Sequence, residues 1–223
     1  MRIPRNVVGI IFGLVIVSVV LGSPVMANAE DCAGSANEGW DAGSANGWIG
    51  ATGTTITVMN SGGNPDGYLK GEKSGPVMIQ TETPPFTGNY VTGGIREISV
   101  DIQLFSGDNV SGPLFRIRQD AYSNGWYYDF SGTLTIDGQW HHYVAPVNPY
   151  WDDQQAQDAG WIPMDNPVVV SFADTLAGVG YLIFWVNAIN TPEVAGFDNA
   201  TIACPLFFDG FENGDTGGWS SGK

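Results

Sequence analysis

Short runs of strand-forming residues, each ended by turn formers after a few positions, limit what this chain can fold into. Glycine and proline are the poorest helix formers, and the 223 residues include 31 glycines and 13 prolines. They gather with asparagine and aspartate between the apolar runs, as in the segments 60–67 and 84–85. The pattern predicts an all-β protein in which only Asp152–Ala159 forms a helical turn.

The clearest predicted strand is Arg96–Phe105, where apolar and polar residues alternate strictly. Apolar residues occupy the even positions from Ile98 to Leu104, so they would share one face and leave a polar face to solvent. Together with similar runs elsewhere, this strand predicts a jelly-roll β-sandwich of about ten short antiparallel strands. The other runs are Thr54–Met59, Gly75–Glu82, Leu114–Gln119, Gly125–Phe130, Gly132–Ile136, Trp140–Val144, Pro167–Phe172, Gly180–Ala188 and Gly196–Cys204.

The N-terminal residues 1–29 read as a secretory signal peptide. Arg2 and Arg5 precede an apolar run, Val7–Leu21, and small residues follow up to Ala29. The run is shorter than the roughly 20 apolar residues of a membrane-spanning helix. We therefore expect a secreted chain, extracellular or on the cell surface, with no membrane insertion after cleavage.

The charge of the chain excludes one class of partner. The formal net charge is −15, with 23 acidic residues and 8 lysines and arginines. Nucleic acids need a basic surface, so we expect no nucleic-acid binding. The acidity fits solubility outside the cell, and as an alternative some carboxylates hold Ca²⁺.

The chain has two cysteines, Cys32 and Cys204, and both lie beyond the signal peptide. Disulfides form in the secretory compartment, and the chain has no CxxC spacing for a metal or redox site. A Cys32–Cys204 bond would close a loop of about 170 residues and contribute up to about 5 kcal/mol. It would also mark the edges of one domain, 30–204, leaving 205–223 as a C-terminal tail.

Four motifs resemble a known family. They are Asn64–Leu69, Pro85–Tyr90, Asp137–Tyr143 and Gly196–Ile202. Together they are similar to the laminin B (laminin IV) domain, although their tryptophan and Phe-Asp-Asn signatures also occur in carbohydrate-binding jelly rolls. The tail resembles the DGFE-x-GD ending of secreted bacterial proteins. The resemblance implies a β-sandwich with a non-enzymatic, extracellular role.

The same resemblance implies a metal site. In similar carbohydrate-binding jelly rolls a structural Ca²⁺ joins an acid of the first strand to the aspartate of the last strand, and the matching residues here are Asp41 and Asp198. Calcium takes six to eight oxygen ligands, so carboxylates at the chain ends suit it. Alternatively, Asp198 makes only turn or backbone hydrogen bonds.

Aromatic and basic residues supply candidates for a ligand-binding face. Exposed Trp and Tyr rings stack on sugars while Arg bonds their hydroxyls, whereas the alternative is that these rings fill the core. The predicted ligand-binding residues are Arg116, Arg118, Trp126, Tyr128, Trp151 and Trp161. The last two fall in a long acidic segment that we expect to be a loop.

The sequence holds no recognisable catalytic constellation. Glu97 and Asp101 share a strand face but lie about 13 Å apart, too far for a glycosidase pair. His142 lacks the partners of a lyase, and no nucleophile elbow or zinc motif occurs. The sequence therefore predicts a secreted binding module for a glycan or an extracellular partner. One alternative is a structural or adhesive surface protein, and a further alternative is a polysaccharide-active enzyme.

Overall fold

The computed structural model describes residues 34–107, 110–121, 125–130, 132–165, 169–187 and 192–204. The predicted signal peptide 1–29, Cys32 and the tail 205–223 lie outside the described residues. Within the described part, the helices are all too short or too polar to cross a membrane.

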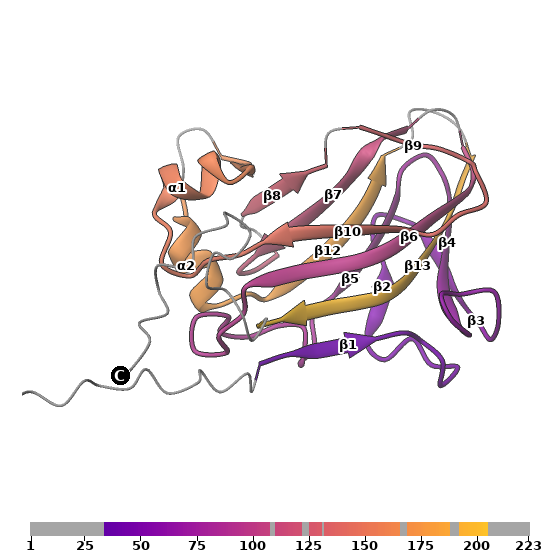
Figure 1. Ribbon diagram of the computed structural model, residues 1–223, viewed down its shortest axis with the longest axis horizontal. Helices are drawn as coiled ribbons and strands as arrows, with labels where there is room; N and C mark the ends of the chain where they lie inside the picture. The colour runs from indigo at the N-terminus through magenta and orange to yellow at the C-terminus, as the bar shows by residue number, and fades with distance from the viewer. Residues whose placement is uncertain are drawn as a thin grey trace, which may run out of the picture.

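Two antiparallel sheets form the molecule (Figure 1). Sheet A has the order β10-β6-β13-β4-β3, with β1 beside β13, and sheet B has the order β11-β8-β7-β12-β5-β2, with β9 beside β7. The strands of sheet A are β1 (Ala36–Glu38), β3 (Thr55–Met59), β4 (Tyr68–Ser74), β6 (Glu97–Ser106), β10 (His141–Pro146) and β13 (Pro192–Ala203). The strands of sheet B are β2 (Trp48–Gly50), β5 (Val77–Thr81), β7 (Val110–Arg118), β8 (Trp126–Asp129), β9 (Thr133–Leu134), β11 (Trp161–Pro163) and β12 (Tyr181–Asn187). The predicted all-β jelly-roll sandwich is confirmed.

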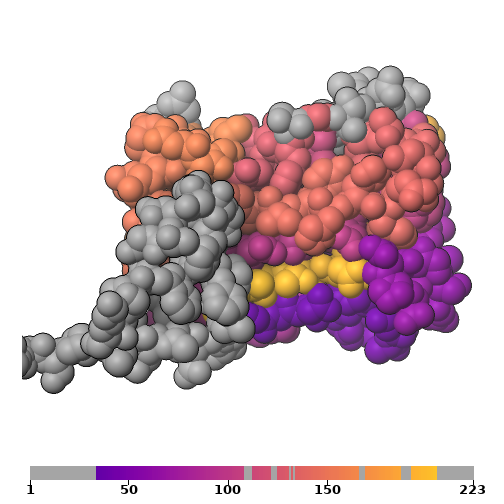
Figure 2. Space-filling model, in the orientation of Figure 1, coloured from indigo at the N-terminus to yellow at the C-terminus, as the bar shows by residue number. Residues whose placement is uncertain are grey.

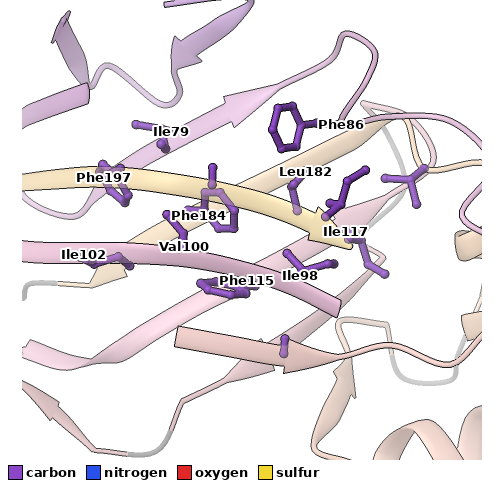
Figure 3. Close-up of a cluster of buried hydrophobic side chains, with 14 of the residues drawn as sticks. Ile79, Phe86, Ile98, Val100, Ile102, Phe115, Ile117, Leu182, Phe184 and Phe197 are labelled. Carbon is purple, nitrogen blue, oxygen red and sulfur yellow. The ribbon is translucent and has the colours of Figure 1, made fainter. Parts of the chain in front are cut away.

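The core lies between the two sheets. The even-numbered residues of β6 from Ile98 to Leu104 are buried there, as their alternation predicts. They meet Phe115 of β7 and Phe184 of β12, whose rings pack edge to face with centroids 4.7 Å apart (Figure 3). Apolar burial on both inner faces therefore sets which side of each strand is left for function.

The outer side of β6 differs from the solvated face that the sequence predicts. Ser99, Asp101 and Gln103 point away from the core yet are at most 8% exposed. Asn64 of the segment 60–67 and His142 of β10 both bond Asp101 there, as described below. Alternation identifies the two faces of a strand but does not show what lies over the outer one.

Two short helices interrupt the strands. Helix α1 (Asp153–Asp158) lies in the predicted helical turn, with a capping box between Asp152 and Gln155. Residues 169–171 of the expected strand Pro167–Phe172 form no strand and Phe172 begins helix α2 (Phe172–Ala177), so that prediction is wrong for the described part of the run. The hydroxyl of Ser171 accepts a hydrogen bond from Asp174 N at 3.0 Å, and this N-cap begins a helix despite the preceding valines.

The two ends of the described chain lie side by side. Strand β1 pairs with β13, and Cys204 N donates a hydrogen bond to Ser35 Oγ at 3.2 Å. The expected disulfide needs this proximity, since Cys32 precedes Ser35 by three positions. The bond itself stays a prediction, because Cys32 is not among the described residues.

Candidate functional site

A continuous row of side chains crosses the outer face of sheet B from edge to edge. Neighbouring strands pair these residues directly, so they line up across six strands. The residues between them along β7 and β12 are buried in the core, which places the row on the outer face, although Ile183 itself is only 1% exposed because Tyr181 and Trp185 pack around it. The row is Ile49, Gln80, Ile183, Arg116, Tyr127 and Ile162.

Trp185 lies beside this row on the same face. It pairs with Met78 of β5 and Leu114 of β7, and it packs against Met78 and Ile183 while its ring stays partly exposed. Its indole N–H is buried and has no acceptor among the described residues. The packing holds the ring in one place on a rigid strand.

Arg116 and Arg118 both lie on this outer face. The guanidinium of Arg118 stacks on the ring of Tyr181 with its Cζ 4.1 Å from the centroid, and its Nη1 donates to Ala121 O at 3.3 Å. Burial lowers the pKa of Arg116, the charge of Arg118 lowers it further, and Asp165 acts in the opposite sense. Sheet B thus holds two guanidinium groups in fixed positions. We call Gln80, Arg116, Arg118, Tyr127, Tyr181 and Trp185 the sheet B platform.

Three of the predicted ligand-binding residues point the other way. Trp126 and Trp161 are 0% exposed, and their indole N–H groups donate to Val170 O at 3.0 Å and to Pro146 O at 2.7 Å. Tyr128 is partly buried and packs against the core, with its ring in contact with Trp161 and Phe130. Sugar stacking needs an open ring face, so we correct the prediction for these three residues. They line the inner face of sheet B.

Trp151 is not the open ring that its loop position suggested. It lies half-buried just before α1 and packs over Phe172 with ring centroids 6.3 Å apart. The exposed aromatic residue of that loop is its neighbour Tyr150, which is 72% exposed and lies 5.3 Å from Arg96 Cζ. The loop therefore buries its tryptophan and presents a tyrosine.

The two predicted metal ligands lie close together at one end of sheet A. A Cβ atom on Gly39 would lie 3.2 Å from Asp41 Oδ2 and 3.5 Å from Asp198 Oδ1. Asp198 is fully buried, and both Asn64 N and Asn199 N donate to its carboxylate. Burial raises the pKa of Asp198 to about 6; the two N–H donors lower it, and the charges of Asp41 and Asp101 raise it.

Asp101 forms a separate hydrogen-bonded hub beside Asp198. His142 Nδ1 lies 2.6 Å from its Oδ1, and the amides of Asn64 and Asn199 donate to its Oδ2 at 3.0 and 2.8 Å. Through Asn64 these bonds fasten the segment 60–67 onto β6 and β13, while His142 joins β10 to β6. Within the described ranges, no group of three or more His, Cys, Asp or Glu side chains is arranged to hold a metal ion.

Three aromatic rings of the platform were not predicted from the sequence. These rings belong to Tyr127, Tyr181 and Trp185, each of which neighbours a buried residue in its strand. The arginines of β7 are the sequence signal for the face on which they lie. Arg116 alternates with the apolar residues of β7, so residues paired with it across the sheet share its outer face. That inference needs the strand register, which the sequence does not supply.

Comparison with known proteins finds likeness of fold only. No family model matches the chain, and no curated protein matches its sequence. The CBM22-1 xylan-binding domain of Paenibacillus barcinonensis Xyn10C is 12% identical, with a TM-score of 0.49 over 75% of this chain and 92% of that domain. The family 11 carbohydrate-binding module of Clostridium thermocellum is 14% identical, with a TM-score of 0.47 over 75% of this chain and 94% of that module.

A third structure, an exo-β-agarase, is 13% identical with a TM-score of 0.50. The match covers 74% of this chain and 24% of the enzyme, so it corresponds to one part of that protein. The laminin B resemblance and the resemblance of the tail stay predictions. The likeness agrees with the two-sheet jelly roll of this chain and extends to its fold alone.

Proposed function

We propose that this protein is a non-catalytic, secreted module that binds a polysaccharide on the outer face of sheet B. The observation that carries the proposal is the platform itself, where Tyr127, Tyr181 and Trp185 accompany two arginines and a glutamine on rigid strands. Aromatic rings pack against the C–H faces of sugars, while guanidinium and amide groups bond their hydroxyls. The platform combines both kinds of group.

The length of the row favours an extended ligand. Six strands about 4.8 Å apart span about 24 Å, which suits several sugar units in a chain better than a single ring. The strands fix their side chains by pairing and packing, so the face loses little conformational freedom when it binds. We therefore propose the interior of a linear polysaccharide as the ligand.

A non-catalytic role fits the use of the acidic residues. Asp101, which shares a strand face with Glu97, is bonded to His142 and to two asparagine amides. A carboxylate that already makes these hydrogen bonds favours a structural role for Asp101 over acid–base catalysis. The alternative is a polysaccharide-active enzyme, and release of products from a glycan would establish it.

Binding to a panel of insoluble and soluble polysaccharides tests the function. We expect Trp185→Ala to weaken retention at least ten-fold, because its ring is a partly exposed aromatic anchor. Tyr150→Ala is the matched control, since it removes an aromatic side chain 72% exposed outside the platform. Two results would exclude sheet B as the binding face. One is an equal loss of polysaccharide binding in Trp185→Ala and Tyr150→Ala, and the other is unchanged binding in the double variant Trp185→Ala, Arg116→Ala.

We also propose a structural Ca²⁺ held by Asp41 and Asp198. Both carboxylates lie on the same side of Gly39, and the described residues place no Lys or Arg against either of them. Hard oxygen donors suit Ca²⁺, and carbonyl oxygens or water would complete the ligands. When bound, the ion would neutralise the charge that the two carboxylates share.

Thermal unfolding with and without Ca²⁺ tests the metal. At 100 times its dissociation constant the ion adds about 2.7 kcal/mol to the free energy of unfolding, so the melting temperature should rise. The rise should vanish in Asp198→Asn, while Asp137→Asn, an acid on the turn before β10, should keep it. No response of the wild-type protein to Ca²⁺ would end this part of the proposal.

The proposed Cys32–Cys204 disulfide completes the secreted module. Its support is that Ser35 lies against Cys204 and that Cys204 is not a free thiol. Peptide mass mapping without reductant should recover a Cys32–Cys204 pair from exported protein. Recovery of both cysteines as free thiols would refute the bond and weaken the assignment to an oxidising compartment.

A further inference from the structure

Three aromatic rings meet on the outer face of sheet A, on the side of the sandwich away from the platform. We call Tyr68 of β4, Phe105 of β6 and Trp140, just before β10, the aromatic triad. Tyr68 lies 5.5 Å from Trp140 and 5.6 Å from Phe105 between ring centroids, and Phe105 lies 6.4 Å from Trp140. Two of the three contacts are edge to face, so the rings form a tightly packed cluster rather than a flat stack.

A glycine seats the triad on the sheet. Gly196 of β13 pairs with Lys70 of β4 and Gln103 of β6, between the strands that carry the rings. A Cβ atom there would lie 2.7 Å from Trp140 Cη2, 2.9 Å from Phe105 Cε2 and 3.1 Å from Tyr68 Cδ2. The rings therefore lie directly on the backbone of β13. Figure 2 views this face, with β13 (yellow) between β1 (indigo) and the strands above it.

The triad is open to solvent at its rim. Phe105 is 37% exposed, Trp140 is partly exposed, and the indole N–H of Trp140 makes no hydrogen bond with the described residues. Tyr68 is the most buried of the three rings, at 7% exposure. The hydrophobic core lies on the other side of sheet A, so burial in the core does not explain why three rings gather here.

Polar groups of both kinds border the triad. Lys70 Nζ lies 3.1 Å from Glu72 Oε2, and both residues share the outer face of β4 with Tyr68. Burial raises the pKa of the Tyr68 hydroxyl, Lys70 lowers it and Glu72 raises it, which places both charges close to that hydroxyl. The pair has no net charge, yet it offers hydrogen-bond donors and acceptors. An uncharged, hydroxyl-rich ligand complements such a border better than an ionic one does.

We propose that the aromatic triad is a second saccharide-binding site, which takes a single neutral sugar ring at the end or branch of a glycan. The sugar ring would stack on the exposed surface of Phe105 and Trp140, with Lys70, Glu72 and the indole N–H of Trp140 bonding its hydroxyls. The site goes beyond the proposed function and does not depend on it, because it shares no residue with the sheet B platform. Two sites on opposite faces would let one module bridge two glycan chains.

Ligand-observed NMR with a panel of neutral monosaccharides and short oligosaccharides tests the site in the Trp185→Ala background, where the platform is weakened. We expect residual binding that Phe105→Ala reduces at least ten-fold. Phe105→Tyr, which keeps the ring, should retain binding within about three-fold. Circular dichroism and thermal unfolding would check that each variant is folded. Because Phe105 is partly exposed, we expect its substitution to leave the fold intact.

Val144→Ala supplies the matched control, since it trims a 38% exposed apolar side chain on the outer face of sheet A outside the triad. Residual binding that is equal in Phe105→Ala and Val144→Ala would overturn the proposal. So would a concentration-dependent dimer in sedimentation that Phe105→Ala dissolves, because the triad would then join two copies of the chain. Failure of the platform shows instead as unchanged polysaccharide binding in Trp185→Ala alone, so the two failures are distinguishable.

Discussion

The two faces of sheet B carry similar aromatic side chains with opposite consequences. In strand β8, Trp126 and Tyr128 pack inward, while Tyr127 between them faces out beside Arg116. The inner tryptophan is fully enclosed and its indole N–H reaches a backbone carbonyl. A ring on the inner face contributes to folding and a ring on the outer face is available for binding, although the sequence places them side by side.

Neighbouring strands turn this local alternation into a surface. Tyr127 becomes part of a binding candidate only because β7 and β12 bring Arg116 and Ile183 into the same row. On the inner face the same pairing brings Phe115 against Tyr128. Substitutions on the two faces should therefore separate stability from affinity.

The largest effect is expected from Trp161→Ala on the inner face. Removing a fully buried indole creates a cavity and leaves Pro146 O without its donor, so the free energy of unfolding should fall by about 3–5 kcal/mol. Urea denaturation followed by far-UV circular dichroism measures the loss. Intact stability combined with lost glycan binding would contradict the assignment of Trp161 to the core.

The adjacent pair Tyr128→Ala and Tyr127→Ala compares the faces most directly. Tyr128→Ala should cost about 2 kcal/mol of stability, because its ring packs against Phe130 and Trp161. Tyr127→Ala should change stability by less than about 1 kcal/mol and lower polysaccharide affinity about five-fold or more. Calorimetric titration and denaturation of both variants measure the two effects, and a reversed pattern would mean that the register of β8 is wrong.

Arg118→Lys tests the guanidinium on the outer face. The variant keeps the charge but loses the planar stack on Tyr181, so affinity should fall about three- to ten-fold while stability changes by less than about 1 kcal/mol. Arg96→Lys, which changes an arginine outside the platform, is the control. An unaffected affinity would show that only charge matters at this position.

The smallest effect is expected from Gln80→Ala. Its side chain supplies one neutral amide to the platform and donates to Glu82 Oε1 at 2.7 Å, so its loss should weaken binding by about 0.5 kcal/mol, roughly two-fold. Affinity measured at two temperatures would resolve such a change. A loss as large as that in Trp185→Ala would place the centre of the site nearer β5 than we propose.

Part of the fold could be read from the sequence because its signals are local. The alternation from Ile98 to Leu104 identified β6 and its core face, and the helical turn predicted at Asp152–Ala159 contains α1. Strand β4 was missed because its residues are mostly polar or glycine, and pairing with β3 and β13 makes it a strand. Helix α2 was missed because the valines before it suggested a strand, whereas Ser171 caps a helix.

The candidate site was harder to predict for a physical reason. Arg116 and Arg118 were identified because they alternate with Phe115 and Ile117 within one strand. Choosing Trp126 and Tyr128 as their partners failed because a shift of one position between strands exchanges the two faces. Asp41 and Asp198 were proposed together from a resemblance, and the structure places them close without testing the ion.

The sequence by itself determined an all-β chain, the alternation within its strands and an acidic net charge. These follow from short-range sterics, hydrophobic patterning and the number of charged residues, all of which can be taken from the sequence directly. Only the tertiary structure decided which strands are neighbours, and therefore that Trp185 and Tyr127 share a face with Arg116 while Trp126 and Trp161 lie in the core. Strand register depends on contacts between residues far apart in sequence, so no local pattern contains it.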